Sequence, residues 1–579
     1  MKSFRIRIFL FLVFFLLVFL GIIARLVFLM VVQHDFYLER SEKQIQKLIK
    51  IDTSRGKIFD RNNHPLAMSR PVHSVYASPM RIKDKTAFAT IVAPLLDMSV
   101  QDVLKKINNS SSFVWLKRKI DNIDTEAIST LFPQQMNVLQ EERRVYPNNV
   151  LLGDVLGFVG MDKGLGGLEY QFDRFLTGEE GYYIIKGDPR GVRIISSNKT
   201  LIGRAKGFAQ AERGMEASSL RGGNIVTTID YRVQFLVEKL LKENIERVEA
   251  EGGQVIVMDV KNGEVLAMAN YPYFDPNYYQ ESDYSVLKNS CIVDVFEPGS
   301  TFKIVTYAAA LEEKIVTPGT IIEIPETIVI QRRRIKEAHD RKPEDPTHYE
   351  AKDILIKSMN VGTSMLAEKM GAAAFLNYIQ SFGFGDRTSI YLPGETSGLV
   401  RSLSQIAPID NAVMSFGQGI SVTSLQMTAA VAAIGNNGMY IRPRIIKHQT
   451  DHNNLTISHL GSFRQRRVVS SKTAQLVRAA MEDVVAKGTG RYAQVKGYRI
   501  GGKTGTAQKP LENGRGYEED AYIASFVGLL PIQSPRYAIL VAIDEPQTTI
   551  WGSTAAAPLF SEVAKVMIDY YDIEPTITK

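Results

Sequence analysis

The chain opens with an almost unbroken apolar run. Residues 8–24 carry no charge, and after Arg25 the apolar pattern resumes through Val32. At about 1.5 Å per residue, a helix over 8–32 can cross a hydrocarbon core about 30 Å thick. The run is longer than the apolar part of a cleavable signal peptide, and its end lacks the small residues of a cleavage site. We therefore predict a retained transmembrane helix over residues 8–32.

The charges on either side of this run predict its orientation. Lys2, Arg5 and Arg7 precede it, whereas the acidic and basic residues that follow it nearly cancel. Basic flanking residues stay on the cytoplasmic side of a membrane. We therefore expect a cytoplasmic tail over residues 1–7 and a single pass through the inner (cytoplasmic) membrane. The rest of the chain is expected on the periplasmic, extracytoplasmic side.

Two segments with different patterns follow the span. Residues 36–218 alternate short strand-like runs, helical patches and turns, which predicts an elongated, mixed pedestal domain. After residue 219 the periodic segments are longer. A strand-like run at 224–229 leads to Asp230, which is placed to cap an amphipathic helix through Val248.

The second segment also contains a strong hairpin signal. Two apolar runs flank Lys261, Asn262 and Gly263, and Asn-Gly between such runs favours a tight turn. Three further strand-like runs, at 498–506, 522–529 and 537–544, precede a last helix at 558–571. Two strands at the start and three at the end predict an α+β domain over residues 219–572, with a five-stranded mixed sheet and helices.

Composition excludes several classes of protein. The hydrophobic content of 45% and the charged content of 23% are typical of globular domains. The single cysteine, Cys291, excludes an intrachain disulfide framework and a cysteine-rich zinc module. A net charge of +7 over 579 residues is mild, and no nucleic-acid signature accompanies it. The eight histidines form no metal-ligand pattern, so we expect no metal site.

The first candidate for chemistry is Ser300, followed three residues later by Lys303. Pro298 and Gly299 mark a turn, after which an alanine-rich apolar run begins. A serine in the first turn of a buried helix meets backbone N–H groups that stabilise an alkoxide. Burial lowers the pKa of a lysine one turn on, so that its neutral amine can accept the serine proton. Alone the pattern is weak, because Ser-x-x-Lys occurs four times and also describes a helix start with a solvent-reaching lysine.

Two further motifs are equally weak by themselves. Ser358-x-Asn360 offers a hydroxyl and a carboxamide, but an ordinary helix cap has the same residues. Residues 501–506 are rich in glycine and threonine around Lys503, which suits close approach of a ligand backbone to a strand. Residues 497–504 also match the phosphate-loop pattern, which must open a helix. Gly505 and Pro510 oppose a helix there, so we set nucleotide binding aside.

Together and in this order, the three motifs are far more specific. Ser-x-x-Lys, Ser-x-Asn and Lys-Thr-Gly form the set found in penicillin-binding proteins and class A β-lactamases. From the apolar run to the C-terminus, the sequence resembles class B penicillin-binding proteins, and among them the septal cell-division transpeptidases. Met359 stands where β-lactamases carry aspartate, a position that varies in the division family. The resemblance is carried by residues 55–62, 166–169, 263–269, 295–300, 416–419 and 497–500.

The resemblance implies a peptidoglycan D,D-transpeptidase with a serine acyl-enzyme. Ser300 would attack the D-Ala-D-Ala carbonyl of a stem peptide, Lys303 would be its base, and β-lactams would mimic the donor. An amine of a second stem peptide would resolve the acyl-enzyme, and the resemblance implies no metal or organic cofactor. The implied roles of the other site residues are proton relay for Ser358, amide binding for Asn360, and carboxylate binding at Lys503, Thr504, Gly505 and Thr506. The oxyanion would sit on the N–H groups of Ser300 and Thr506.

The resemblance also implies partners and a location. A multispanning septal glycan polymerase and other division proteins would meet the chain in the membrane at the division septum. Arg55, Asp60, Arg61 and Glu169 match motif positions of the dimerisation-like pedestal, where they serve either partner contact or structural ion pairing. Two alternatives stay open: an elongation-specific class B transpeptidase, and a catalytically weak penicillin-sensing receptor.

Overall fold

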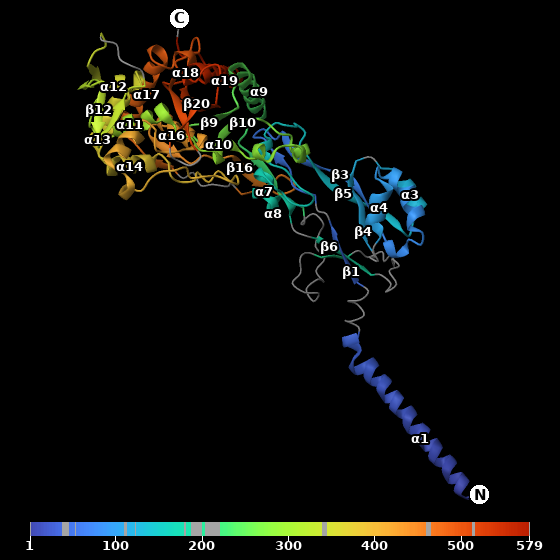
Figure 1. The fold of residues 1–579 in the computed structure, drawn as a ribbon. Helices are drawn as coiled ribbons and strands as arrows, with labels where there is room; N and C mark the ends of the chain where they lie inside the picture. The colour runs from blue at the N-terminus through green and yellow to red at the C-terminus, as the bar shows by residue number, and fades with distance from the viewer. Residues whose placement is uncertain are drawn as a thin grey trace. The chain divides into compact units, whose positions relative to one another are not determined.

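The chain folds into two units that are each described by themselves (Figure 1). One comprises Met1–Ser54 and Thr177–Gly222, and the other comprises Arg55–Leu176 and Gly223–Lys579. The computed structural model describes residues 2–37, 46–51, 54–108, 113–121, 123–178, 181–186, 200–202, 221–338, 344–458, 465–511 and 516–577.

The first unit contains the apolar N-terminal helix. Helix α1 (Lys2–Val27) continues as the π-helical turn η1 (Phe28–Val32). Among the described residues, Ile6–Val32 is the one helical stretch long and apolar enough to cross a membrane, and the predicted span 8–32 lies inside it. The same unit has a small antiparallel sheet of β1 (Gln46–Ile51), β6 (Gly181–Lys186) and β7 (Thr200–Ile202).

The second unit begins with a mixed sheet. Its order is β17-β16-β8-β2-β3-β4, and β5 also pairs with β3. The sheet is mixed because β2 and β8 run parallel, whereas the other pairs are antiparallel. It joins strands from both sides of the predicted boundary at residue 218. The strands are β2 (Ile58–Phe59), β3 (Pro65–Ala77), β4 (Val114–Ile120), β5 (Met136–Val145), β8 (Asn224–Thr227), β16 (Ile446–Thr450) and β17 (Thr456–Ser458).

Short helices surround the pedestal strands. Val75, Phe88, Val103 and Leu116 are among the buried residues that join β3 and β4 to the helices beside them. These helices are α3 (Lys85–Leu95), α4 (Val100–Ile107) and α5 (Thr125–Leu131), and α6 (Gly153–Leu156), α7 (Gly167–Gln171) and α8 (Asp173–Thr177) follow.

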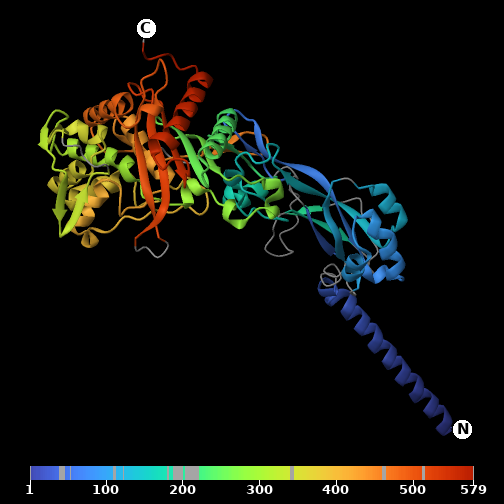
Figure 2. The same ribbon diagram turned by 45° about the horizontal axis from the view of Figure 1, so that its top comes forward.

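The five-stranded sheet predicted from both ends of the second domain is present. Its order is β10-β9-β21-β20-β19. Figure 2 shows the long strands of its C-terminal part in orange. Every pairing is antiparallel, so the expectation of a mixed sheet was wrong for this sheet. Short turns connect β9 to β10 and β20 to β21 and reverse the chain there, whereas the antiparallel pairing of β9 with β21 joins the two ends of the domain. The strands are β9 (Gly252–Asp259), β10 (Val265–Tyr271), β19 (Gly501–Pro510), β20 (Tyr517–Leu530) and β21 (Tyr537–Asp544).

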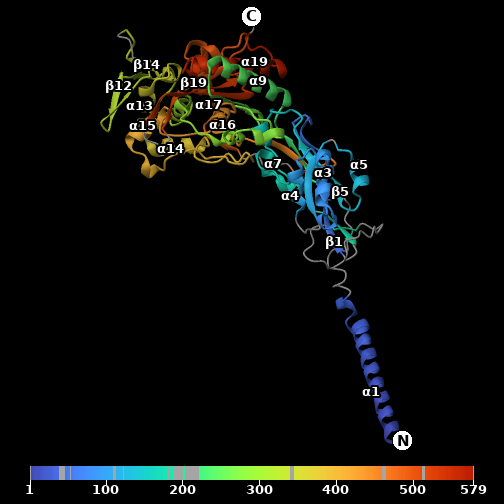
Figure 3. The ribbon, with the colours of Figure 1, turned by 45° about the vertical axis from the view of Figure 1, so that its right-hand side comes forward.

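Helices cover both faces of this sheet (Figure 3). Helices α9 (Tyr231–Val248) and α19 (Ala557–Tyr570) bury one apolar face, with Val237, Val541 and Phe560 in the shared core. On the other face, α11 (Lys303–Glu312), α16 (Ser424–Gly435) and α17 (Ser471–Lys487) pack in a second core. The remaining elements are α10 (Ser290–Val293), α12 (Ala351–Ile356), α13 (Asn360–Met370), α14 (Ala372–Ser381), α15 (Pro408–Ser415), α18 (Gly552–Ala555) and the short strands β11 (Ile321–Glu323), β12 (Thr327–Ile330), β13 (Arg333–Lys336), β14 (His348–Glu350), β15 (Met439–Ile441) and β18 (Gln465–Arg467).

Two local predictions are confirmed. The Asp230 carboxylate accepts hydrogen bonds from the N–H groups of Arg232 and Val233, so it caps α9. The Asn-Gly turn joins β9 to β10, and Gly263 has a φ of +74°, a conformation that glycine adopts without strain. The apolar runs on either side of this turn therefore become the first two strands of the sheet.

Candidate active site

Ser300 lies in the turn that leads into a buried helix. The 3₁₀ turn Gly299–Phe302 is continuous with α11, whose first residue is Lys303. The amide of Gly299 donates to the carbonyl of Gly417 at 3.1 Å. A Cβ atom at Gly417 would stand 2.3 Å from the carbonyl oxygen of Gly299, so a larger residue there would displace the turn. This close packing fixes the position of Ser300.

Lys303 connects the first motif to the second. Its side chain is buried, and Nζ donates to Oδ1 of Asn360 at 2.6 Å and to the carbonyl of Ser358 at 2.7 Å. Oγ of Ser358 lies 3.2 Å from the same nitrogen. Burial lowers the pKa of Lys303 to about 7, although the negative charge of Glu337 opposes this shift. Near neutral pH, a large fraction of Lys303 is therefore an uncharged amine.

The second motif is held by a residue that sequence reasoning missed. Ser358 has a φ of +59° in the connection between α12 and α13. The carboxylate of Glu337 accepts hydrogen bonds from the N–H groups of Asn360, at 2.5 Å, and Val361, at 3.2 Å. Glu337 thus caps α13 from the end of β13. No local pattern pairs it with a helix that begins 23 residues later.

The third motif lies on the edge strand β19. Nζ of Lys503 lies 3.1 Å from the carbonyl of Thr504 and 3.3 Å from its hydroxyl. Oγ1 of Thr506 accepts a hydrogen bond from the amide of Gly552 at 3.0 Å. Lys503 is completely buried, so burial and then the charge of Lys303 hold its pKa well below the usual value. A carboxylate bound beside Lys503 would stabilise its charged form.

Strand β19 packs directly against the Ser300 turn. A Cβ atom at Gly505 would stand 3.0 Å from the Pro298 carbonyl oxygen and from Cγ2 of Thr301. The same Cβ atom would stand 2.4 Å from Oγ of Ser525, so a glycine suits the close packing of this strand on both sides. The structure brings all three motifs into one site. It also excludes a phosphate loop, because residues 501–510 form a strand and do not open a helix.

A second missed carboxylate lies beside the Ser300 turn. Glu297 accepts hydrogen bonds from the amide of Gly419 at 2.7 Å and from the hydroxyl of Tyr517 at 3.1 Å. Burial raises the pKa of Glu297. These contacts connect the residues before Ser300 to residues 416–419 and to β20. No spacing in the sequence indicated that these segments meet.

Two of the pedestal motif residues form a buried ion network. Arg55 pairs with Glu169 at 2.6 Å and with Asp173 at 2.8 Å. Arg144 pairs with the other oxygen of Glu169 at 2.6 Å and donates to the carbonyl of Gly56. The Glu169 side chain is fully buried. This geometry supports the structural alternative for Arg55 and Glu169.

The other two motif residues join the pedestal to the second domain. Asp60 is buried, and its carboxylate accepts hydrogen bonds from the amides of Asn62 and His64 and, at 3.2 Å, from the amide of Tyr231 at the start of α9. Arg61 pairs with Glu264 in the β9–β10 connection at 3.1 Å. Neither residue contacts the three motifs in these interactions; both link the segment before residue 218 to the segment after it.

Comparison with known protein families and structures agrees with this arrangement. A family described as the penicillin-binding protein transpeptidase domain matches residues 253–565, and the penicillin-binding protein dimerisation domain matches residues 50–206. The chain is 33% identical to stage V sporulation protein D of Bacillus subtilis, over 99% of this chain and 86% of that protein. It is 31% identical to peptidoglycan D,D-transpeptidase FtsI of Escherichia coli, over 96% of this chain and 90% of that protein.

Solved structures give the same result. Penicillin-binding protein 3 of Mycobacterium tuberculosis, solved with aztreonam, has a TM-score of 0.69 and 27% identity, over 91% of this chain and 98% of that one. A peptidoglycan synthetase of Bifidobacterium adolescentis has a TM-score of 0.72 and 26% identity, over 92% and 98% of the two chains. The chain therefore belongs to the class B penicillin-binding proteins, as a D,D-transpeptidase with a dimerisation domain ahead of its transpeptidase domain.

Proposed function

We propose that this enzyme crosslinks peptidoglycan stem peptides during septal cell-wall synthesis, through an acyl-enzyme on Ser300. The observation that carries the proposal is the position of Lys303. Its buried Nζ contacts both residues of the second motif, one helical turn after Ser300. A lysine with a pKa of about 7 is suited to accept the serine proton at neutral pH.

The substrate would bind along the free edge of β19. An extended peptide can add to an edge strand through main-chain hydrogen bonds. Its terminal carboxylate would then lie by Lys503, Thr504 and Thr506, with Gly505 leaving room for the Ser300 turn. Asn360 would bind the amide on the acyl side of the reacting bond.

The reaction would proceed in two balanced steps. Neutral Lys303 takes the hydroxyl proton as Oγ of Ser300 attacks the D-Ala-D-Ala carbonyl, and the N–H groups of Ser300 and Thr506 stabilise the oxyanion. The proton passes from Lys303 through Ser358 to the departing nitrogen, and D-alanine leaves. The amine of a second stem peptide then attacks the ester, which forms the crosslink and returns the proton to Ser300.

β-Lactams would react at the same serine because they mimic the donor. Two neighbouring structures support this, since penicillin-binding protein 3 of M. tuberculosis was solved with aztreonam and with ampicillin. When the β-lactam ring opens, the leaving nitrogen stays attached to the acyl group and remains in the site. The amine of a second stem peptide therefore cannot complete the reaction. The expected product is a stable penicilloyl-enzyme.

The direct test compares two serines in the same kind of motif. Ser300→Ala should abolish covalent labelling by fluorescent penicillin, because Lys303 and Ser358 cannot form an acyl-enzyme without the Ser300 hydroxyl. Ser54 also begins a Ser-x-x-Lys pattern but does not open a buried helix, so Ser54→Ala should label like the unmodified protein. Stoichiometric acylation of the Ser300→Ala protein at another serine would overturn the assignment.

The septal role and its setting are the finer part of the proposal. They rest on the likeness to FtsI of E. coli and on the apolar helix Ile6–Val32 as a single membrane anchor with residues 1–7 inside. We propose a pedestal over 36–218 and a catalytic domain over 219–572, with a multispanning glycan polymerase and other division proteins as partners. Localisation of the full chain in dividing cells distinguishes the septal role from the elongation role. Enrichment at midcell supports the septal role, whereas labelling along the side wall supports the elongation alternative.

A further inference from the structure

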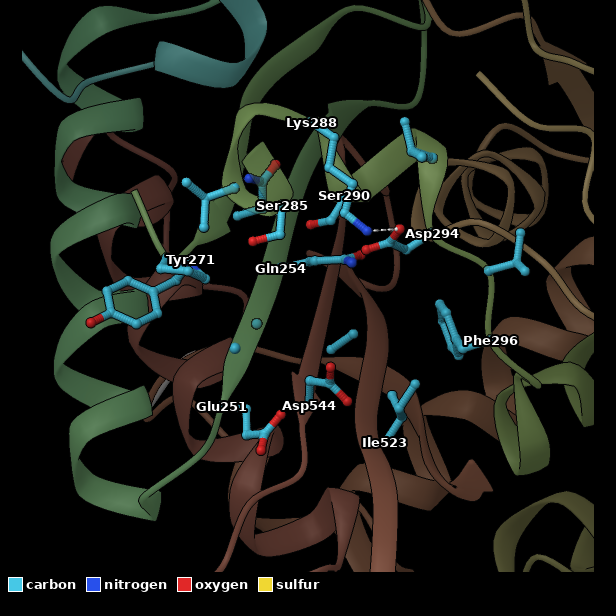
Figure 4. A pocket seen from close by; sticks show the side chains of 18 of the residues that line it. Glu251, Gln254, Tyr271, Ser285, Lys288, Ser290, Asp294, Phe296, Ile523 and Asp544 are labelled. Atoms are coloured by element: carbon cyan, nitrogen blue, oxygen red, sulfur yellow. Dashed lines mark hydrogen bonds and ion pairs between the residues drawn. The ribbon is translucent and has the colours of Figure 1, made fainter. Parts of the chain in front are cut away.

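A cavity of about 570 Å³ lies at one end of the five-stranded sheet, where β9 begins and β21 ends. The segment before the nucleophile turn forms its other wall (Figure 4). Its polar lining includes Glu251, Gln254, Asn270, Lys288, Asp294 and Asp544, and it contains none of the residues of the three catalytic motifs. Its size is that of a pocket for a small organic ligand.

One end of this cavity has an excess of negative charge. The amide of Glu251 donates to the carbonyl of Asp544 at 3.0 Å, so the two carboxylates belong to neighbouring residues of the sheet end. Lys509 is shared between Asp544, at 3.2 Å, and Glu545, at 2.5 Å. Lys509 thus has two carboxylate partners, and Glu251 is a further carboxylate in the lining at this end of the cavity. Burial raises the pKa of Asp544. The net negative charge at this end of the cavity would attract an added cation.

The other end of the cavity is electrically balanced. Nζ of Lys288 lies 2.5 Å from Oδ1 of Asp294, so each charge already has a partner (Figure 4). Val286, Phe296 and Ile523 supply apolar surface in the same lining. A ligand with a cationic group and a short hydrocarbon chain would therefore match both parts of the cavity.

A buried acceptor in the wall lacks a donor. Asn270 is only 5% exposed, and within the part of the chain that the structure describes its Oδ1 has no hydrogen-bond partner. Its neighbour across the strands is Gln254, whose Oε1 already accepts a hydrogen bond from Ser424. Leaving such an acceptor unpaired is costly, and a ligand N–H would satisfy it.

We propose that this cavity binds a primary ammonium ligand, the amine of a diamino compound or of a peptide side chain, at a site separate from Ser300. The ammonium group lies between Glu251 and Asp544, its methylene chain packs on the apolar lining, and a second N–H group reaches Asn270. The wall residue Phe296 is four positions before Ser300 and pairs with Val422 through both backbone groups, at 3.0 and 2.9 Å. The site therefore adjoins the nucleophile turn without including it.

Calorimetric titration of the full chain tests the ligand class. The probes are cadaverine for a free diamine, Nα-acetyl-lysine amide for a peptide amine, and Nα,Nε-diacetyl-lysine amide as the uncharged control. We expect binding of one or both amines and none of the diacetyl compound. Binding of the peptide amine alone identifies a peptide as the source of the ammonium group. Absence of binding by both amines, or equal binding of the diacetyl compound, overturns the proposal.

Variants place the binding in this cavity. Glu251→Gln and Asp544→Asn should each weaken amine binding about tenfold, since each removes one charge-assisted contact. Glu246→Gln makes the same charge change on the exposed face of α9 and should have no effect. Glu251 has an exposed side chain, so its substitution should leave the fold intact even if that of Asp544 does not. Equal affinity in the Glu251→Gln protein contradicts the assignment.

The Ser300→Ala protein separates this inference from the proposed function. It should bind the amines as the unmodified chain does, because Ser300 is outside the cavity. Conversely, Glu251→Gln should retain penicillin labelling at Ser300. Loss of amine binding in the Ser300→Ala protein, or competition between the amines and penicillin for one site, would place the amine in the catalytic site and overturn the proposal.

Discussion

Nζ of Lys303 donates a hydrogen bond to Oδ1 of Asn360 at 2.6 Å, so the lysine of the first motif is held by a residue of the second. The two residues come from the starts of different helices, α11 and α13. Their contact explains how a buried lysine is kept in place near the Ser300 turn, although burial disfavours its charged form. The position and the low pKa therefore have separate causes, hydrogen bonding and burial.

The first prediction concerns the pH dependence of acylation. A lysine is neutral above its pKa, so a base with a pKa of about 7 becomes active as the pH rises through that value. The rate constant for acylation by penicillin should increase from about pH 5 and level off above about pH 8. Stopped-flow fluorescence measures this rate. A profile that stays flat across this range would exclude Lys303 as the titrating base.

The second prediction concerns Glu337. Glu337→Ala removes the acceptor for the amides of Asn360 and Val361, so the second motif should lose its alignment. We expect acylation to slow by about tenfold or more, because small displacements of reacting groups are costly. Glu344→Ala is the matched control, because Glu344 is an exposed glutamate a short distance along the chain from Glu337.

The charge of Glu337 can be tested apart from its hydrogen bonds. Glu337→Gln keeps an acceptor oxygen but removes the negative charge that favours protonated Lys303. The midpoint of the acylation profile should therefore move to lower pH. An unchanged midpoint in a protein that still folds would show that Glu337 does not act on Lys303 electrostatically.

The third prediction concerns the junction between the domains. Arg61→Glu would place a carboxylate beside Glu264, which also pairs with Arg444 at 2.6 Å. We expect the free energy of unfolding to fall by about 1–2 kcal/mol, since a partly buried pair is replaced by repulsion. Denaturant unfolding measures the loss, and the second substitution Glu264→Gln should restore part of it. Penicillin acylation of the folded variant should be retained; its loss at normal stability would contradict a purely structural role.

The fourth prediction concerns two buried carboxyl groups. Glu238 on α9 accepts hydrogen bonds from the amide of Leu152, at 2.9 Å, and from Gln234, at 2.8 Å. Burial raises its pKa to about 7, and burial also raises the pKa of Asp154 nearby. Between its unfolded pKa and about 7, the folded protein binds more protons at Glu238 than the unfolded chain does. Stability should therefore decrease as the pH rises through this window.

Glu238→Gln tests this linkage. The amide keeps an acceptor oxygen but cannot ionise, so the variant should lose less stability between about pH 5 and pH 8. The difference should be at most about 3 kcal/mol, and Asp154 should leave part of the dependence in place. Thermal unfolding at several pH values measures it. If stability falls equally with pH in the variant and in the unmodified protein, Glu238 is not the source of the pH dependence.

The sequence by itself determined local elements and the three motifs that meet in the candidate site. Asp230 predicts the start of α9, and the Asn-Gly turn predicts the β9–β10 hairpin, because caps and tight turns depend on neighbouring residues. Ser300 and Lys303 could be selected because their motif precedes an apolar run. The order of three motifs then indicated the family, even though each motif alone is common.

Only the tertiary structure decided how distant segments meet. The direction of the strands depends on pairings such as β9 with β21, which sequence periodicity does not specify. The joining of β8 and β16 to the pedestal sheet is a further case. Glu337 and Glu297 act on residues far along the chain, and Arg61 reaches Glu264 across 203 positions. Burial sets the pKa of Lys303, and burial is a property of the packed molecule that no single stretch of residues contains.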